Sequence, residues 1–318
     1  MIKKPEELNF SDQKFSMIIY GSPGVGKTTL ALSAPNPVLI DFDRGISRVR
    51  AQHRKATIVC DTYEEVLKDL ESDDIKAFET IIVDTGGSFV SFLQDWAMRI
   101  NPAVNKQKNG AISLKGFGAV KAEFARFTNY VKDVLHKNII YVFHSQEQTD
   151  KDGNAQQRLL CEGAAKNLVW TPCDFGGYVQ MIGNRRVICF TPEQEFFAKG
   201  CHGISGQIPV PQLGESDAND FLTRLFDQAK SNINAEVEAL APKKDAYAEI
   251  MAKVKEIIDG VTDAESATKA ASAIPEMEHV LTSKKEASSL LQKKAKELGL
   301  KWDKVAKIYY VEEKKEAK

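Results

Sequence analysis

The residues with the clearest chemistry lie between Gly21 and Thr29, where the chain reads Gly-Ser-Pro-Gly-Val-Gly-Lys-Thr-Thr. This segment fits the phosphate-binding pattern G-x-x-x-x-G-K-S/T, with Gly21, Gly26, Lys27 and Thr28 at the fixed positions. Backbone N–H groups of such a loop converge on phosphate oxygens, and glycines permit the close approach. Lys27 is expected to reach the β- and γ-phosphates, and the Thr28 hydroxyl to bind Mg²⁺. The segment predicts a site for ATP and Mg²⁺ made by Gly21, Ser22, Pro23, Gly24, Val25, Gly26, Lys27, Thr28 and Thr29.

Two later apolar runs end in acidic residues that suit the rest of such a site. Residues 80–83 are followed by Asp84, the candidate second ligand for Mg²⁺ beside the loop threonine. Residues 37–40 are followed by Asp41 and then by Asp43. Ligands of open α/β sheets bind beyond the carboxyl ends of the strands, so Asp43 is expected to face the γ-phosphate and to orient a water molecule. Asp41 is expected to lie behind Asp43, one layer further from the phosphates. The alternative is that both acids lie in solvent at the end of the strand.

A third apolar run, residues 139–143, ends in polar side chains. His144 and Gln146 follow it. An imidazole or an amide at the carboxyl end of a strand is placed to sense the γ-phosphate. We therefore group both with Lys27 and Asp43 as candidate catalytic residues, with a purely structural histidine as the alternative.

The elements that must position these residues alternate along the chain. Residues 15–20 form an apolar run before the phosphate loop, and a helical pattern begins at Thr29 after it. Continuous apolar runs are typical of parallel strands covered on both faces. Amphipathic stretches separate the runs, and the first carries a T-x-x-E capping box at Thr62. Together they predict an α/β fold with a mainly parallel sheet.

Composition limits the remaining possibilities. The chain has 318 residues, 43% hydrophobic and 27% charged, with a net charge of −1. No overall basic field attracts it to nucleic acid, so any DNA contact must come from a local patch. Five irregularly spaced cysteines without a C-x-x-C pair argue against a zinc site or a disulfide framework. The sequence has no secretory signal and no span for a membrane, which predicts a cytoplasmic protein.

The segment 101–118 is one candidate for a DNA-binding patch. It interrupts the helical pattern and carries Lys106, Lys108 and Lys115 with Phe117, and no acid. A basic loop with an aromatic ring suits contact with single-stranded DNA, although a plain surface loop is equally compatible with the sequence. The polar segment 147–162 is expected to be a second loop or hairpin at the edge of the active site.

The C-terminal part of the chain differs in composition from the rest. We expect a core over residues 1–230, a polar linker over 231–244 and a small helical domain over 245–318. Between residues 284 and 307 there are eight lysines and three acids, and Trp302, Tyr309 and Tyr310 lie in or just after this stretch. Lysines interleaved with aromatic residues suit phosphate contact with base stacking. The alternative is a solvated helix over a small aromatic core.

The order of loop lysine, strand-end acid, Mg²⁺ acid and polar sensor resembles the RecA-like ATPase core. The chain most resembles phage-encoded RecA-core proteins of the AAA class, a group that includes single-strand annealing proteins. The resemblance rests on four segments within the first 215 residues: Tyr20–Thr29, Ile40–Gly45, Lys115–Gly118 and Phe196–Gly200.

The resemblance implies a function and an assembly. It implies ATP-dependent assembly on single-stranded DNA as a homo-oligomeric ring or filament, in the cytoplasm of a host cell. It also implies active sites between protomers, with a basic residue donated in trans. Lys199 matches the position of that residue and Arg186 is the second choice. Family members often continue with Asp-Arg where this chain has Gly200 and Cys201.

Three functional hypotheses follow. The first is a Mg²⁺-dependent ATPase, slow without DNA or a partner, that acts on single-stranded DNA in recombination or annealing. The second is a nucleotide-dependent loader or assembly switch that binds a protein partner without contacting DNA. The third is a small-molecule kinase, which would consume nucleotide only when an acceptor is present. A G-protein is excluded because the base-reading N-K-x-D motif is absent.

Overall fold

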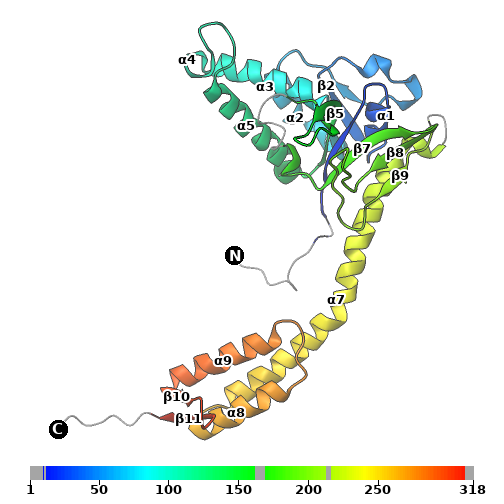
Figure 1. Ribbon diagram of the computed structural model, residues 1–318. Helices are drawn as coiled ribbons and strands as arrows, with labels where there is room; N and C mark the ends of the chain where they lie inside the picture. Colours follow the sequence, from blue (N-terminus) through cyan, green and yellow to red (C-terminus); the bar gives the residue numbers. More distant parts are fainter. Residues whose placement is uncertain (1–9, 11, 162–168, 213–215, 312–318) are drawn as a thin grey trace. The chain divides into compact units, whose positions relative to one another are not determined.

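The computed structural model describes residues 10, 12–161, 169–212 and 216–311 (Figure 1). The chain divides into two compact units, one of residues 10–233 and one that begins at residue 234. The division falls inside helix α7 (Phe221–Asp259). The segment 231–244, which we expected to be a linker, is therefore helical, in keeping with the helix-forming alanine, glutamate and lysine residues among its polar side chains.

The first unit is built on one nine-stranded sheet. Its strand order is β3-β2-β4-β5-β1-β7-β8-β9, and β6 pairs with the extended end of β5. The pairs among β3, β2, β4, β5, β1 and β7 are parallel, whereas the β5–β6, β7–β8 and β8–β9 pairs are antiparallel. The strands are β1 Ser16–Gly21, β2 Pro37–Asp41, β3 Thr57–Ile58, β4 Thr80–Asp84, β5 Asn138–Thr149, β6 Ala155–Leu159, β7 Phe175–Ile182, β8 Arg185–Cys189 and β9 Gln207–Pro209.

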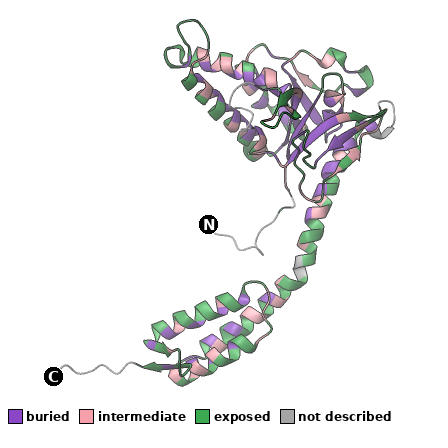
Figure 2. Ribbon diagram, in the orientation of Figure 1, coloured by how far each residue is buried: buried purple, intermediate pink, exposed green. Residues whose placement is uncertain are grey.

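Helices cover both faces of this sheet, which explains why the central strands are continuously apolar. One core joins the strands to α2, α3 and α5, through residues such as Val66, Phe89 and Phe127. The other core joins them to α1 and to the start of α7, through Leu30 and Phe226. Figure 2 shows the strands as the buried layer between these helices. The helices are α1 Lys27–Ala31, α2 Tyr63–Leu70, α3 Gly86–Ile100, α4 Pro102–Asn105 and α5 Leu114–Asn129.

The prediction of an α/β fold with a mainly parallel sheet is confirmed. The capping box at Thr62 starts α2, with the Thr62 hydroxyl accepting from the backbone N–H of Glu65. The two-residue turn Gly183–Asn184 joins β7 to β8, and Gly183 has the positive φ of 58° that such a turn needs. No helix within the described residues is both long and apolar enough to cross a membrane.

The prediction of a loop over residues 101–118 is wrong for about half of its length. Helix α4 occupies its start, a tight turn follows in which Lys106 and Ile112 form a β-bridge, and α5 begins at Leu114. Ser113 is the N-cap of α5, and its hydroxyl accepts a hydrogen bond from the backbone N–H of Gly116 at 3.0 Å. A capping serine can start a helix even where the following residues include two glycines, because the cap satisfies an otherwise unpaired donor.

The second unit is helical, as expected, and also contains a hairpin that we did not predict. Helices α8 (Ala264–Glu276) and α9 (Ser283–Glu297) pack on the end of α7, and the antiparallel strands β10 (Leu300–Asp303) and β11 (Ile308–Val311) follow. Gly299, at φ 70°, comes directly after α9, and the Asp303 carboxylate accepts from the backbone N–H groups of Val305 and Ala306. These local bonds favour a reversal of the chain over further helix.

Candidate nucleotide site

The phosphate loop connects β1 to α1 in a conformation that depends on its glycines. Gly24 and Gly26 have φ values of 77° and 87°, which residues with a Cβ rarely adopt. A Cβ on Gly21 would lie 2.3 Å from the carbonyl oxygen of Val179 on β7, so the loop needs glycine there too. The Lys27 ammonium folds back over the loop and donates to the carbonyl oxygen of Ser22 at 2.8 Å.

The sheet order brings the predicted side chains to one cavity of about 420 Å³. Strand β5 lies between β1 and β4, and β2 lies beyond β4, so four parallel carboxyl ends face the same edge. Gly21 is level with His144, and Asp84 is level with Asp41. The cavity is lined by Pro23, Gly24, Gly26, Lys27, Thr28, Thr29, Asp43, Gly45, Arg48, Val49, Arg50, Asp84, Thr85, Val142 and His144.

Thr28 and Asp84 form a pair that suits Mg²⁺. The Thr28 hydroxyl donates to the Asp84 carboxylate at 2.5 Å, and Asp84 is only 6% exposed. Burial raises the pKa of Asp84 to about 6, and the nearby carboxylates of Asp43 and Asp41 act in the same direction. Mg²⁺ prefers oxygen ligands and commonly binds through one or two protein side chains plus phosphates and waters. The pair therefore fits the metal, which would neutralise charge on the phosphates.

The raised pKa of Asp84 gives a prediction about stability without nucleotide. A pKa raised from 3.8 to about 6 means that protonation stabilises the folded chain, fully below about pH 4, and that this stabilisation is lost as the pH rises through 6. At pH 8 the buried carboxylate is ionised at a cost. We expect Asp84→Asn, which keeps an acceptor for Thr28, to raise the free energy of unfolding at pH 8 by roughly 1–3 kcal/mol.

Urea titrations of both proteins at pH 8 and pH 5 measure this difference. The increase in the free energy of unfolding that Asp84→Asn causes should be smaller at pH 5, because wild-type Asp84 is then mostly protonated. An equal gain at both pH values would show that ionisation of Asp84 is not its cause. The same variant should lose the dependence of nucleotide affinity on Mg²⁺ while Asp69→Asn, an exposed change on α2, should keep it.

Asp43 and Asp41 have different surroundings despite lying two residues apart. Asp43 lines the cavity and accepts hydrogen bonds from the hydroxyls of Thr85 (3.2 Å) and Ser88. Asp41 is 2% exposed, and its two oxygens accept from the backbone N–H groups of Gly45 (2.7 Å) and Ile46 (2.9 Å). Asp43 is thus placed as expected for a group facing the phosphates, and Asp41 holds the backbone of the loop that carries it.

Of the two candidate sensors, the structure brings only His144 to the cavity. Its Nδ1 lies 3.4 Å from the Lys27 ammonium, and burial, then the Lys27 charge, lower the pKa of the imidazole. An ammonium can only donate, so Nδ1 must accept and the proton of the neutral ring is on Nε2. Gln146 lies further along β5, pairs with Arg158 of β6 and donates to the carbonyl oxygen of Leu159 at 3.4 Å.

Two arginines of the basic segment 44–55 line the cavity, although basic clusters in a sequence are more often solvated surface. Arg48 and Arg50 reach it from the loop after Asp43, and the structure gives neither side chain a hydrogen bond or ion pair within the described residues. By contrast, Arg44 pairs with Asp61, and Arg54 donates to the carbonyl oxygen of Val49 at 2.9 Å. The signal available in the sequence was the position of the cluster directly after a strand-end acid.

We expect Arg48→Ala to weaken ATP binding about tenfold. A guanidinium bond to a phosphate contributes roughly 1.5–3 kcal/mol, and about 1.4 kcal/mol is a factor of ten in affinity. Arg44→Ala is the matched control, because it removes the same charge from the same loop outside the cavity. Fluorescence titration with a labelled ATP analogue measures both. Equal losses in the two variants would mean that only the general charge of the loop matters.

The two basic residues considered for a role in trans lie in different places. The Lys199 ammonium donates to the carbonyl oxygen of Cys173, just before β7 begins, at the opposite edge of the sheet from its own phosphate loop. Arg186 on β8 lies against the loop: a Cβ on Gly26 would be 3.0 Å from its guanidinium. Its Nε is buried and has no hydrogen-bond partner among the residues that the structure describes, and burial lowers the pKa of the guanidinium. Of these two residues, only Arg186 lies near the phosphate loop of its own chain.

The candidate DNA-binding residues of the core are separated from the cavity. Helix α3 starts after its N-cap Thr85 beside the cavity and extends 15 residues, or about 22 Å, before α4 begins. Lys106 and Lys108 lie in the turn after α4, and Lys115 and Phe117 lie in the first turn of α5. The three lysines are exposed and Phe117 is half-buried. The β5–β6 hairpin continues directly from His144 instead, although residues 162–168 beyond it lie outside the described residues.

A protein-family model covers the part of the chain that forms this cavity. A family model described as an AAA domain matches residues 13–202, more than half of the chain. A solved structure that matches part of the chain is the flagellar accessory protein FlaH from Methanocaldococcus jannaschii. The match has 11% sequence identity and a TM-score of 0.31, and it covers 62% of this chain and 90% of that chain. No curated protein sequence matches the chain. The matched residues contain the phosphate loop and every side chain of the cavity, and the chain belongs to the AAA domain family of P-loop ATPases.

Proposed function

We propose that the core binds ATP with Mg²⁺ and hydrolyses it to act on single-stranded DNA, in recombination or in strand annealing. The observation that carries the hydrolytic part is the position of Asp43. Its carboxylate lines the same cavity as Lys27 and the Thr28–Asp84 pair, and the hydroxyls of Thr85, the N-cap of α3, and of Ser88 in its first turn fix its orientation. A carboxylate held in this way can orient a water molecule for attack on a bound phosphate.

Five side chains of the cavity have a direct role in this proposal. Lys27 leaves the Ser22 carbonyl and binds the β- and γ-phosphates, while Thr28 and Asp84 hold Mg²⁺. Asp43 accepts a hydrogen bond from the attacking water. His144 offers its Nε2 proton to the γ-phosphate, so its contacts differ before and after hydrolysis. Strand β5 continues from His144 into the β5–β6 hairpin at the surface. A change in the contacts of His144 can therefore alter the position of this hairpin.

The DNA part of the proposal has separate support. It rests on the resemblance to RecA-core annealing proteins, on exposed lysines in the 106–115 region and on the lysine-rich second unit. Assembly into a ring or filament belongs to the same proposal. In such an assembly, Lys199 of one protomer is the candidate basic residue for the nucleotide site of the next protomer. Arg186 lies beside the phosphate loop of its own chain, so we assign it to that loop.

ATP hydrolysis measured with and without single-stranded DNA tests the proposal. We expect DNA to raise turnover at least several-fold, with an effect that declines steeply as salt rises, because phosphate contacts release counterions. A double-stranded DNA of the same length is the control for simple polyanion effects. Turnover that is real but unchanged by DNA from low to moderate salt would contradict the DNA part and leave the ATPase part standing.

A second candidate function is a nucleotide-dependent switch or loader that binds a protein partner. The observation that favours it is the surface of the 101–118 region, where Leu114 is 90% exposed and Val104 is 42% exposed. Exposed apolar side chains of this kind suit a protein contact better than a phosphate backbone. If the chain has this function, Leu114→Ser should abolish binding of the protein partner. Its ATP turnover should stay the same as that of wild type and should not depend on DNA.

A further inference from the structure

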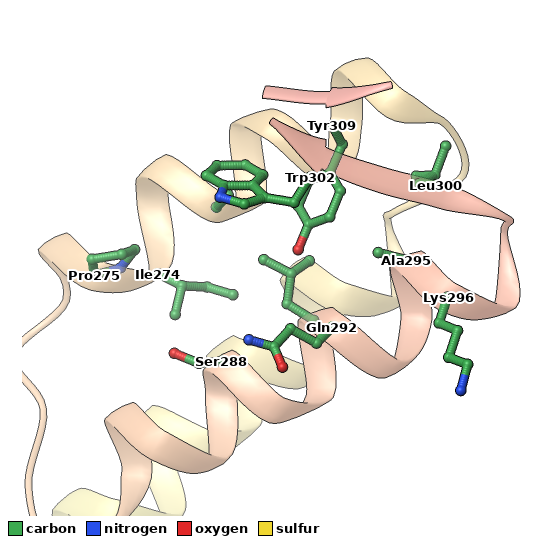
Figure 3. A pocket seen from close by; sticks show the side chains of 11 residues that line it. Ile274, Pro275, Ser288, Gln292, Ala295, Lys296, Leu300, Trp302 and Tyr309 are labelled. Atoms are coloured by element: carbon green, nitrogen blue, oxygen red, sulfur yellow. The ribbon is translucent and has the colours of Figure 1, made fainter. Parts of the chain in front are cut away.

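The second unit contains a cavity of about 390 Å³ that has no part in the nucleotide site. It lies between α8, α9 and the β10–β11 hairpin (Figure 3). Its floor is apolar and includes Ile274, Leu291 and Leu300, which also belong to the core of this unit. The volume is within the range of sites that bind small molecules or single groups of larger ones.

One wall of the cavity is aromatic. Trp302 and Tyr309 face each other across the hairpin register, so their side chains share one face of it. Their ring centroids are 4.8 Å apart, and the planes meet at 57°. Tyr309 is 9% exposed and anchored in the core, whereas Trp302 is 39% exposed. Trp302 therefore presents an indole surface that its neighbour holds in place.

The opposite wall is polar. Ser288, Gln292 and Lys296 follow one another at intervals of four on α9, so they form a stripe along the helix beside the cavity. Figure 3 shows Ser288 and Gln292 across from the aromatic pair, and the Lys296 ammonium directed away from the centre. A hydroxyl and an amide can each donate and accept, as the edge of a nucleobase requires, and an ammonium outside can meet a phosphate.

Charge favours nucleic acid over peptide as the occupant. None of the eleven side chains that line the cavity is acidic. Residues 284–307 around it carry eight lysines and three acids, although the whole chain has a net charge of −1. This concentrates positive charge in one short stretch, as phosphate contact requires. The β5–β6 hairpin of the core does not show this bias, since it has three acids and two basic residues from Gln146 to Arg158.

We propose that this cavity receives one base of a single-stranded DNA, which stacks on Trp302 while Lys296 and other lysines of the 284–307 stretch hold the flanking phosphates. Serine and glutamine on α9 contact the edge of that base. The inference deepens the proposed function and rests on it. It places strand binding in the second unit, so binding does not require ATP.

Fluorescence anisotropy of a labelled twenty-nucleotide thymidine strand, with the full chain and no nucleotide, tests this. We expect Trp302→Ala to weaken binding about tenfold, since stacking on an aromatic ring contributes roughly 1–3 kcal/mol per base. Trp302→Phe should recover most of the affinity. Tyr310→Ala is the matched control: Tyr310 is also about 40% exposed on the same hairpin but lies on its other face.

A strand of the same length in which every position is abasic separates stacking from charge. Wild type should bind this strand at least as weakly as Trp302→Ala binds the thymidine strand, and Trp302→Ala should distinguish the two strands much less than wild type does. Unchanged affinity in Trp302→Ala, or the same preference for bases in that variant, would overturn the proposal. The proposal would also be overturned if Trp302→Ala lost affinity only for poly-glutamate, an acidic peptide used as a second probe, and kept its affinity for the thymidine strand.

Failure of this inference can be told apart from failure of the proposed function. Trp302→Ala should keep its basal ATP hydrolysis, because no residue of the nucleotide site changes. If wild type binds the strand and Trp302→Ala binds equally well, only the cavity assignment falls. If wild type binds no single-stranded DNA even at low salt, the DNA part of the proposed function falls with it.

Discussion

Lys27→Ala should reduce ATP hydrolysis by at least a hundredfold. The Lys27 ammonium lies at the phosphate loop inside the cavity, and removing one preorganised group that stabilises charge in a transition state typically costs about 10²–10³ in rate. The chain should still fold. Burial lowers the pKa of Lys27 from 10.5 to about 8, so its contribution to stability is present above pH 10.5 and is lost as the pH falls through 8. At pH 7 the charged side chain therefore opposes folding, and alanine removes that cost.

Steady-state phosphate release with Lys76→Ala as the control measures this effect. Lys76 is an exposed lysine that pairs with Asp73 on the surface, so its loss changes the net charge equally without touching the cavity. Thermal unfolding of both variants shows whether the fold is intact. Turnover of Lys27→Ala within tenfold of wild type would mean that hydrolysis occurs at another site.

Asp43→Asn and Asp41→Asn should separate catalysis from stability. We expect Asp43→Asn to lower kcat about a hundredfold or more, within the range of 10²–10⁴ for a group that handles the attacking water. ATP affinity and unfolding should change little, because asparagine still accepts from Thr85 and Ser88. Asp41→Asn should instead lower the free energy of unfolding by roughly 1–3 kcal/mol, since one charged oxygen that accepts a backbone N–H becomes an amide donor.

Single-turnover hydrolysis and urea unfolding, applied to both variants, give the two readouts. A loss of stability in Asp43→Asn with normal kcat, and the reverse in Asp41→Asn, would exchange the two assignments. A loss of kcat in both variants with normal stability would show that the loop after β2 works as a unit and that neither acid acts alone.

Much of the nucleotide site could be predicted from the sequence because its determinants are local. The phosphate loop is one continuous segment whose glycines and lysine have fixed spacing, and its backbone conformation depends on few other residues. Apolar runs that end in Asp41 and Asp84 indicate parallel strands, and parallel strands in one sheet must present their carboxyl ends at one edge. The position of Asp43, Asp84 and His144 around one cavity followed from this rule.

The tertiary structure decided what depends on contacts between distant residues. The cluster at 44–54 could be divided into cavity residues and surface pairs only once Arg44 was seen beside Asp61. Likewise, the sequence offers both Lys199 and Arg186 for one role, and only the fold places the Lys199 ammonium at the start of β7 and Arg186 beside the phosphate loop.

The same holds for two of the three segments where our predictions of structure differed from the fold. Ser113 caps a helix across glycines, and Asp303 closes a hairpin in a lysine-rich tail, through one or two local hydrogen bonds that composition does not reveal. Sequence by itself determined that this chain has a phosphate site at a parallel sheet edge, because spacing along the backbone encodes it. Which charges reach that site, and that Trp302 borders a separate cavity, depended on packing between elements far apart in the chain.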